Sequence, residues 1–199
     1  MIRTTTYAAA VAAIFGIAAL PSSGAAQDPQ APPPGTYQAR EQNQQDRIAN
    51  GIQSGQLTAG ETKSLEGQEA SLNAQARSDR AADDGHLTAA DRSQLNSEQN
   101  HLSKEIYTDK HNAATAHYGN NEVGQRRLNQ QDRIANGIRN GSLSAGQAAH
   151  LEGREQHINQ QIHADRAANG GKLTGAEKTQ INHEQNGASH AIYRDKHSK

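Results

Sequence analysis

Three aspartates in the first half of the chain, Asp83, Asp84 and Asp91, have the clearest capacity for chemistry. Carboxylate oxygens are the ligands that calcium prefers. Gly85 lies among them and permits a sharp turn of the backbone. A turn that gathers three carboxylates can surround a divalent cation, so we expect the metal site of this chain, if it has one, at these three residues. The sequence implies no other cofactor than such a weakly bound divalent metal.

Ten histidines form a second group of potential metal ligands. His183, His190 and His197 are seven residues apart, as are His150 and His157. Two histidines on one helix chelate an ion at a spacing of three or four, whereas seven residues span about 10 Å along the axis. No row can hold an ion alone. We therefore interpret the histidines as solvated polar-face residues, with weak zinc, copper or nickel binding as the alternative.

Catalytic motifs are absent from the sequence. It contains no His-Glu-x-x-His, no Gly-x-Ser-x-Gly, no Gly-rich phosphate loop and no cysteine. Asp109-Lys110-His111 recurs as Asp195-Lys196-His197, and we interpret both as polar clusters at helix ends. Asn-Gln-Gln-Asp-Arg begins at Asn43 and again at Asn129, and we interpret both as solvated first turns of helices. These patterns predict that the protein is not an enzyme.

A seven-residue phrase, Gly-x-Leu-[Thr/Ser]-x-x-[Glu/Asp/Gln], occurs four times and determines how these residues are positioned. The copies begin at Gly55, Gly85, Gly141 and Gly171. Glycine after a polar helical stretch ends a helix, and a hydroxyl residue followed three positions later by a carboxylate or amide begins the next one. The phrase predicts four helix–turn–helix junctions, with capping pairs Thr58 and Glu61, Thr88 and Asp91, Ser144 and Gln147, and Thr174 and Glu177.

The loops that contain the phrase also resemble the EF-hand calcium loop, with glycine at the sixth place, leucine at the eighth and a polar residue at the twelfth. They run over residues 50–61, 80–91, 136–147 and 166–177. EF-hand loops need oxygen ligands at their first, third and fifth places, but here the first places are Asn50, Arg80, Asn136 and Arg166. Only the loop with Asp84 and Asp91 retains two matching carboxylates. The resemblance implies weak calcium binding there, and we favour the capping explanation.

Two further resemblances concern exported bacterial proteins. Leu143-Ser144-Ala145-Gly146-Gln147 resembles the Leu-Thr-x-x-Gln motif of small periplasmic helical stress proteins, which include a chaperone and metal-responsive regulators. More generally, the chain resembles uncharacterised exported bacterial helical repeat proteins that contain the same Ile-Ala-Asn-Gly-Ile and Asp-Lys-His phrases. This second resemblance implies a helical fold and brings no known activity.

The sequence duplicates itself. Residues 43–111 align with residues 129–197 at a constant offset of 86, with 39 of 69 positions identical. Such self-similarity is typical of repeat architectures. We predict an all-α fold of two tandem copies of a three-helix unit, with short Gly-x-Leu-Thr turns and coiled-coil-like or bundle packing. The expected helices cover residues 40–53, 58–82, 88–110, 126–139, 144–168 and 174–196.

Apolar residues on these helices form narrow stripes at i, i+7 and i+11. The stripes consist of Leu65, Leu72 and Ala76; Leu95, Leu102 and Ile106; Leu151, Ile158 and Ile162; and Ile181, Ala188 and Ile192. The core is therefore thin, and the alternative is a loose pair of helical arrays on a flexible string. Association of the two copies, or association with another chain, would bury Tyr107 and Tyr193.

The first residues predict export. Arg3, the apolar run 7–20 and the small residues 24–26 are typical of a signal peptide over residues 1–26, and the run is shorter than the ~20 residues of a membrane anchor, which is the alternative. Residues 27–40 contain four prolines and predict a disordered tether. We assign helical repeat 1 to residues 41–112, a linker to 113–125 and helical repeat 2 to 126–199.

The charge balance limits the possible partners. The chain has 20 Lys and Arg and 21 Asp and Glu, so its net charge is −1. Binding to nucleic acid or to an anionic membrane would require a concentrated basic face, which this balance does not favour. We therefore expect a non-enzymatic periplasmic or secreted protein that acts in interactions or stress responses. Its partner is another protein or a second copy of itself, without an integral membrane segment after signal cleavage. The alternative function is binding of a divalent metal, either calcium or zinc and copper.

Overall fold

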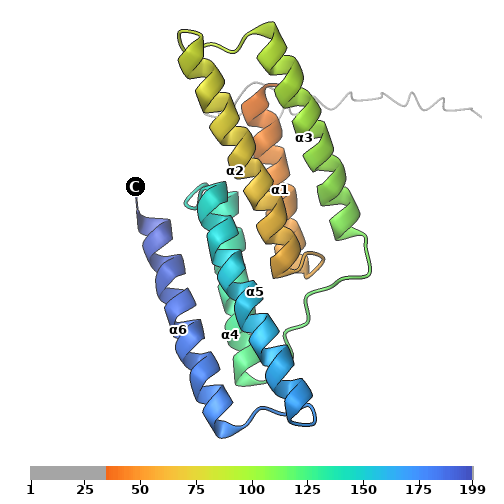
Figure 1. The fold of residues 1–199 in the computed structure, drawn as a ribbon, viewed down its shortest axis with the longest axis vertical. Helices are drawn as coiled ribbons and strands as arrows, with labels where there is room; N and C mark the ends of the chain where they lie inside the picture. The colour runs from red at the N-terminus through yellow and green to blue at the C-terminus, as the bar shows by residue number, and fades with distance from the viewer. Residues whose placement is uncertain (1–34, 199) are drawn as a thin grey trace, which may run out of the picture. The chain divides into compact units, whose positions relative to one another are not determined.

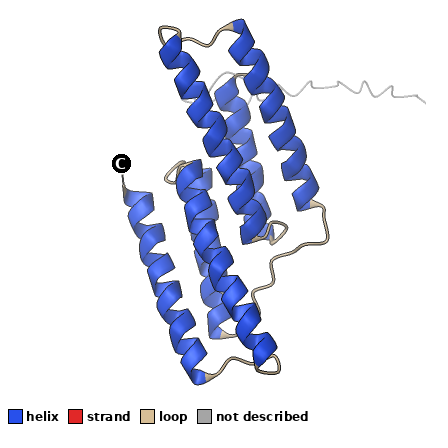
Figure 2. Cartoon of the chain, viewed as in Figure 1, coloured by secondary structure: helices blue, strands red, loops and turns tan. Residues whose placement is uncertain are grey.

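The computed structural model describes residues 35–198, and these residues form six α-helices and no strand (Figures 1 and 2). The predictions that fall on residues 1–34, the signal peptide and most of the tether, lie outside the described residues. The helices are α1 (Tyr37–Ser54), α2 (Ala59–Ala82), α3 (Ala89–Lys110), α4 (Glu122–Arg139), α5 (Ala145–Ala168) and α6 (Gly175–His197). The predicted all-α class is confirmed.

Side chains cap the helices that follow the short turns. Thr58, Thr88, Ser144 and Thr174 each accept a hydrogen bond from the backbone N–H three residues later, and the side chain at that later position accepts from the N–H of the capping residue. The glycines that begin the phrase, Gly55, Gly85, Gly141 and Gly171, all have φ between 68° and 88°. Residues with a Cβ rarely adopt this left-handed conformation.

Helices α1 and α4 begin earlier than predicted. Thr36 caps α1, and Asn121 caps α4 by accepting from the Gly124 N–H at 2.9 Å. Residues 37–40, which we assigned to the tether, therefore form the first turn of α1. Likewise, α4 takes in residues 122–125 of the assigned linker. Neither Thr36 nor Asn121 belongs to a copy of the seven-residue phrase, which contains the caps of the other four helices. The phrase therefore does not predict the starts of α1 and α4.

The two halves of the chain meet along two helix pairs. α2 packs against α5 and α1 packs against α4, while α3 contacts α1 and α2, and α6 contacts α4 and α5. α2 and α5 run antiparallel, because Gly60 near the start of α2 lies beside Gln156, whereas Gly146 near the start of α5 lies beside Ala70. Figure 1 shows α3 and α6 flanking the central four helices. The result is a helical bundle.

The predicted apolar stripes are buried. All twelve of their residues are at most 5% exposed, which confirms that the stripes form the core and argues against a loose string of helices. The larger cluster joins residues of both halves, among them Leu65, Leu102, Ile134 and Leu151, and a smaller cluster surrounds Ile158 and Ile181. Among the described residues, no helix is both long enough and apolar enough to span a membrane.

The first turns that begin at Asn43 and Asn129 are not solvated, contrary to the sequence interpretation. Gln44 and Gln130 are 1% and 2% exposed, and their side-chain amides donate to the carbonyl oxygens of Gln99 and Gln185 at 2.9 and 2.7 Å. An amide can replace its bonds to water by such bonds to backbone, so a polar residue can occupy the core here. Glutamine therefore attaches each outer helix to the bundle.

Candidate functional site

The three aspartates predicted as a metal site lie on the turn between α2 and α3. Asp83 is the C-cap of α2, and Asp84 has φ 49°, which is the only positive value among the described non-glycine residues. The carboxylate of Asp91 closes a capping box. Its Oδ2 accepts from the N–H and the hydroxyl of Thr88 at 2.8 and 2.6 Å, and these hydrogen bonds lower the pKa of Asp91. Asp91 is therefore already occupied as a helix cap.

Histidine side chains are all on the surface, which confirms their interpretation as polar-face residues. His150 and His157 lie on α5, and His183, His190 and His197 lie on α6. Within residues 35–198, no three side chains of His, Cys, Asp or Glu are grouped so that they could hold a metal ion. In this part of the chain, neither the three aspartates nor the histidine rows form such a group.

Two tyrosines are the large hydrophobic residues that the described fold leaves exposed. Tyr107 on α3 is 61% exposed and Tyr193 on α6 is 62% exposed, although each follows an isoleucine that is fully buried. Each tyrosine ring stacks on the histidine one turn later. The centroids of Tyr107 and His111 are 4.2 Å apart at 26°, and those of Tyr193 and His197 are 4.2 Å apart at 28°.

A hydrogen bond fixes each histidine in this stack. Nδ1 of His111 lies 2.6 Å from the carbonyl oxygen of Tyr107, and Nδ1 of His197 lies 2.6 Å from that of Tyr193. A carbonyl oxygen only accepts, so Nδ1 carries the proton in both rings. Two aromatic pairs of the same geometry therefore occupy positions 86 residues apart, at the ends of α3 and α6.

The helix ends that carry the pairs are tied to the bundle. Arg47 on α1 donates to the Ser103 carbonyl at 2.9 Å, and Lys110 on α3 donates to the Arg47 carbonyl at 3.3 Å. On α4 and α6, the same two bonds join Arg133 to Ser189 and Lys196 to Arg133. Each tyrosine is thus carried by a helix end that is fixed to the bundle.

A layer of four buried glutamates occupies the centre of the bundle. Glu66 and Glu69 on α2, and Glu152 and Glu155 on α5, are at most 1% exposed. Gln45 donates to Glu66 at 3.2 Å and Gln131 donates to Glu152 at 2.9 Å. No ion pair of the described residues involves any of the four.

Burial raises the pKa of these carboxyl groups, because the charged form loses its solvation. The pKa rises to about 8 for Glu66 and Glu69, to about 7 for Glu155, and well above its usual range for Glu152. Strongly perturbed carboxyl groups often mark functional sites. Here the four carboxyl groups lie between packed helices, where the neutral, protonated form is favoured over the charged one.

Sequence reasoning did not find this layer. Its only signal is that both Leu-Glu-Gly-x-Glu stretches, from Leu65 and from Leu151, are retained in the two halves. Comparisons of the chain with models of protein families, with curated proteins and with solved structures find no match.

Proposed function

We propose that this protein is an exported, non-enzymatic interaction module made of two tandem copies of a three-helix unit. Each copy binds a partner protein through the tyrosine–histidine pair at the end of its third helix. The observation that supports this proposal is the equal exposure and equal geometry of Tyr107 with His111 and of Tyr193 with His197.

Tyrosine is suited to such a role. It is enriched among the residues that dominate binding energies, since its ring buries a large area while the hydroxyl retains a polar contact. Among the described residues, the hydroxyl groups of Tyr107 and Tyr193 make no hydrogen bond, whereas the Tyr37 hydroxyl donates to Asn73. Both exposed hydroxyls are available to a partner.

The surroundings of the pairs favour an acidic partner. One turn before each tyrosine on the same helix stand Lys104 and His190, and one turn after it stand the stacked histidines. We therefore propose a protein surface with a pocket for the tyrosine ring and an acidic rim. Export of the chain to the periplasm or medium rests on the sequence of residues 1–26.

Chemical crosslinking of the full chain in its native envelope tests the proposal. We expect one acidic protein to be crosslinked, and its yield to fall at least about ten-fold in Tyr107→Ser with Tyr193→Ser, because a residue that dominates a binding site contributes about 2 kcal/mol or more. Gln94→Ala with Gln180→Ala is the matched control, since these exposed residues occupy equivalent positions on the same two helices. Its yield should equal that of the unsubstituted chain.

Two outcomes would contradict the proposal. The first is an unchanged yield in the tyrosine variant. The second is a product that contains only copies of this chain, which sedimentation of the purified protein would show independently as self-association.

A further inference from the structure

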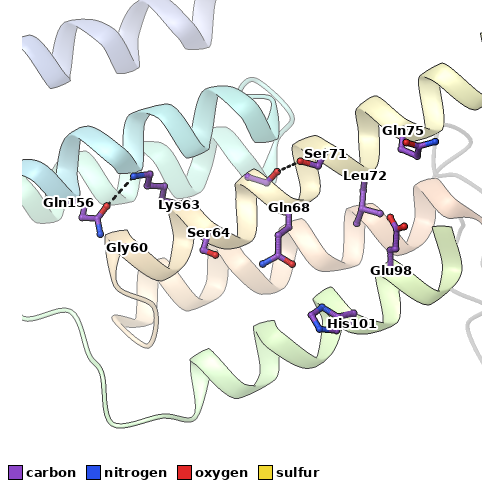
Figure 3. Close-up of a pocket in the computed structure, with 11 residues that line it drawn as sticks. Gly60, Lys63, Ser64, Gln68, Ser71, Leu72, Gln75, Glu98, His101 and Gln156 are labelled. Carbon is purple, nitrogen blue, oxygen red and sulfur yellow. Dashed lines mark hydrogen bonds between the residues drawn. The ribbon is translucent and has the colours of Figure 1, made fainter. Parts of the chain in front are cut away.

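Two surface grooves lie at equivalent places in the two halves of the chain. One follows α2 and α3, has a volume of about 720 Å³ and is lined by Ser64, Gly67, Gln68, Ser71, Glu98 and His101 among others (Figure 3). The other follows α5 and α6, has a volume of about 580 Å³ and is lined by His150, Gly153, Arg154, His157, Glu184 and Gly187 among others. These two sets of six residues correspond one to one at the offset of 86.

The chemistry of the two grooves differs although their positions correspond. Ser64, Gln68 and Ser71 in the first groove are replaced by His150, Arg154 and His157 in the second. Figure 3 shows Ser64, Gln68 and Ser71 along one helix of the first groove. Ser97 is likewise replaced by His183, which lines the second groove. All four replacements exchange a neutral side chain for a cationic or protonatable one.

Small residues leave room in the second groove. A Cβ at Gly187 would lie 3.2 Å from the guanidinium of Arg154, so α6 allows this side chain to cross it. A Cβ at Gly153 would lie 3.6 Å from Cδ and Cε of Lys63, so the lysine of α2 extends across α5 and joins the lining. Ile158 and Ala149 supply apolar surface. The volume is in the range of small-molecule sites.

Positive charge in the second groove exceeds negative charge. Lys63 and Arg154 face one carboxylate, Glu184, which accepts a hydrogen bond from Gln180 at 3.2 Å. Within residues 35–198, Arg154 makes no hydrogen bond and no ion pair, although its charge lowers the pKa of the buried Glu155 behind it. A guanidinium has five N–H donors arranged to bind a carboxylate, sulfonate or phosphate.

We propose that the groove between α5 and α6 binds an amphiphilic organic anion. Arg154 and Lys63 bind the anionic group, and the apolar body of the ligand lies on Ile158 and Ala149. His150, His157 and His183 line the same groove. Lys63 also lines the groove of α2 and α3, but that groove has Gln68 in the place of Arg154 and therefore lacks the guanidinium. This proposal does not depend on the tyrosine–histidine pairs.

Fluorescence titration with 8-anilinonaphthalene-1-sulfonate tests the proposal, because this probe combines an aromatic body with a sulfonate. The full chain should bind one equivalent with enhanced fluorescence, and added salt should weaken binding. N-phenyl-1-naphthylamine has the same body without the sulfonate and should bind at least about ten-fold more weakly, the factor expected when one charge-assisted hydrogen bond is lost.

The duplicated groove provides the matched variants. His150→Ser, Arg154→Gln and His157→Ser together give the second groove the residues of the first, and should weaken sulfonate binding at least about ten-fold without affecting the neutral probe. Ser64→His, Gln68→Arg, Ser71→His and His101→Gly together should create a second site, because Gly187 stands at the place of His101. All seven positions are on the surface except for the half-buried Gln68, and circular dichroism checks that each variant is folded. Equal sulfonate affinity in the unsubstituted chain and the first variant would overturn the proposal.

Discussion

At the scale of single residues, two glycines allow the turns to pack against the helices that precede them. The backbone N–H of Leu57 donates to the Gly51 carbonyl at 3.0 Å, and Leu143 makes the same bond to Gly137. A Cβ at Gly51 would lie 2.6 Å from Cδ1 of Leu57, and a Cβ at Gly137 would lie 2.6 Å from Cδ1 of Leu143. Glycine in the Ile-Ala-Asn-Gly-Ile phrase thus makes room for the leucine of the turn.

Gly51→Ala should therefore destabilise the protein. Leu57 is fully buried and cannot move aside freely, so the added methyl group overpacks the core at a cost that exceeds the helix-forming advantage of alanine. We expect the free energy of unfolding to fall by about 1 kcal/mol. Gly67→Ala is the control, because no side chain lies within 4 Å of its Cβ position, and it should stabilise by about 0.5–1 kcal/mol. Urea unfolding measures both, and a stabilised Gly51→Ala would contradict the explanation.

At the scale of helices and turns, the sequence predicted the elements well but not their polar contacts. The glycine and hydroxyl of each phrase act within seven residues, so local chemistry is sufficient to place the starts of α2, α3, α5 and α6. Burial of Gln44 or Glu66 depends instead on which helix lies opposite. Which helices pack against each other is a property of the whole bundle. The residues next to Gln44 or Glu66 in the sequence therefore do not show that these side chains are buried.

The turn between α2 and α3 should not bind calcium tightly. Asp91 already accepts two hydrogen bonds from Thr88, and its loop begins with Arg80, whose charge would repel the ion. We expect no calcium binding tighter than about 10⁻³ M, the weak limit of extracellular calcium modules. Thr88→Ala should lower the free energy of unfolding by about 0.5–2 kcal/mol, with or without calcium. Calorimetry decides: a micromolar isotherm that disappears in Asp84→Asn with Asp91→Asn would make this turn a metal site.

At the scale of the whole molecule, two carboxyl groups at equivalent positions of the duplication, those of Glu69 and Glu155, have different charged neighbours. Glu41 on α1 raises the pKa of Glu69, while Arg127, at the corresponding place on α4, lowers the pKa of Glu155. Burial is the largest cause and raises both pKa values, to about 8 for Glu69 and about 7 for Glu155, while these neighbours act in opposite directions. Protons held at the centre of the bundle therefore link its stability to pH.

The direction of this linkage follows from the raised pKa values. A carboxyl group whose pKa is higher in the folded protein than in the unfolded chain binds protons preferentially in the folded state. Its contribution is complete below the unfolded value of about 4.5 and is lost as the pH rises through about 7 to 8. The capping carboxylates Asp91 and Glu177 have lowered pKa values and act oppositely, so their contribution is lost in stronger acid.

We therefore expect the melting temperature to be highest in mildly acidic solution and to fall between pH 6 and pH 9. Glu66→Gln with Glu152→Gln should reduce this fall, because glutamine is a neutral replacement for the protonated acid and has no charge to desolvate at high pH. Glu98→Gln, at an exposed position, should leave the pH profile unchanged. Thermal unfolding followed by circular dichroism at pH 5, 7 and 9 measures all three proteins. A melting temperature that rises toward pH 9 would contradict this linkage, because it would show that the buried glutamates are ionised in the folded protein.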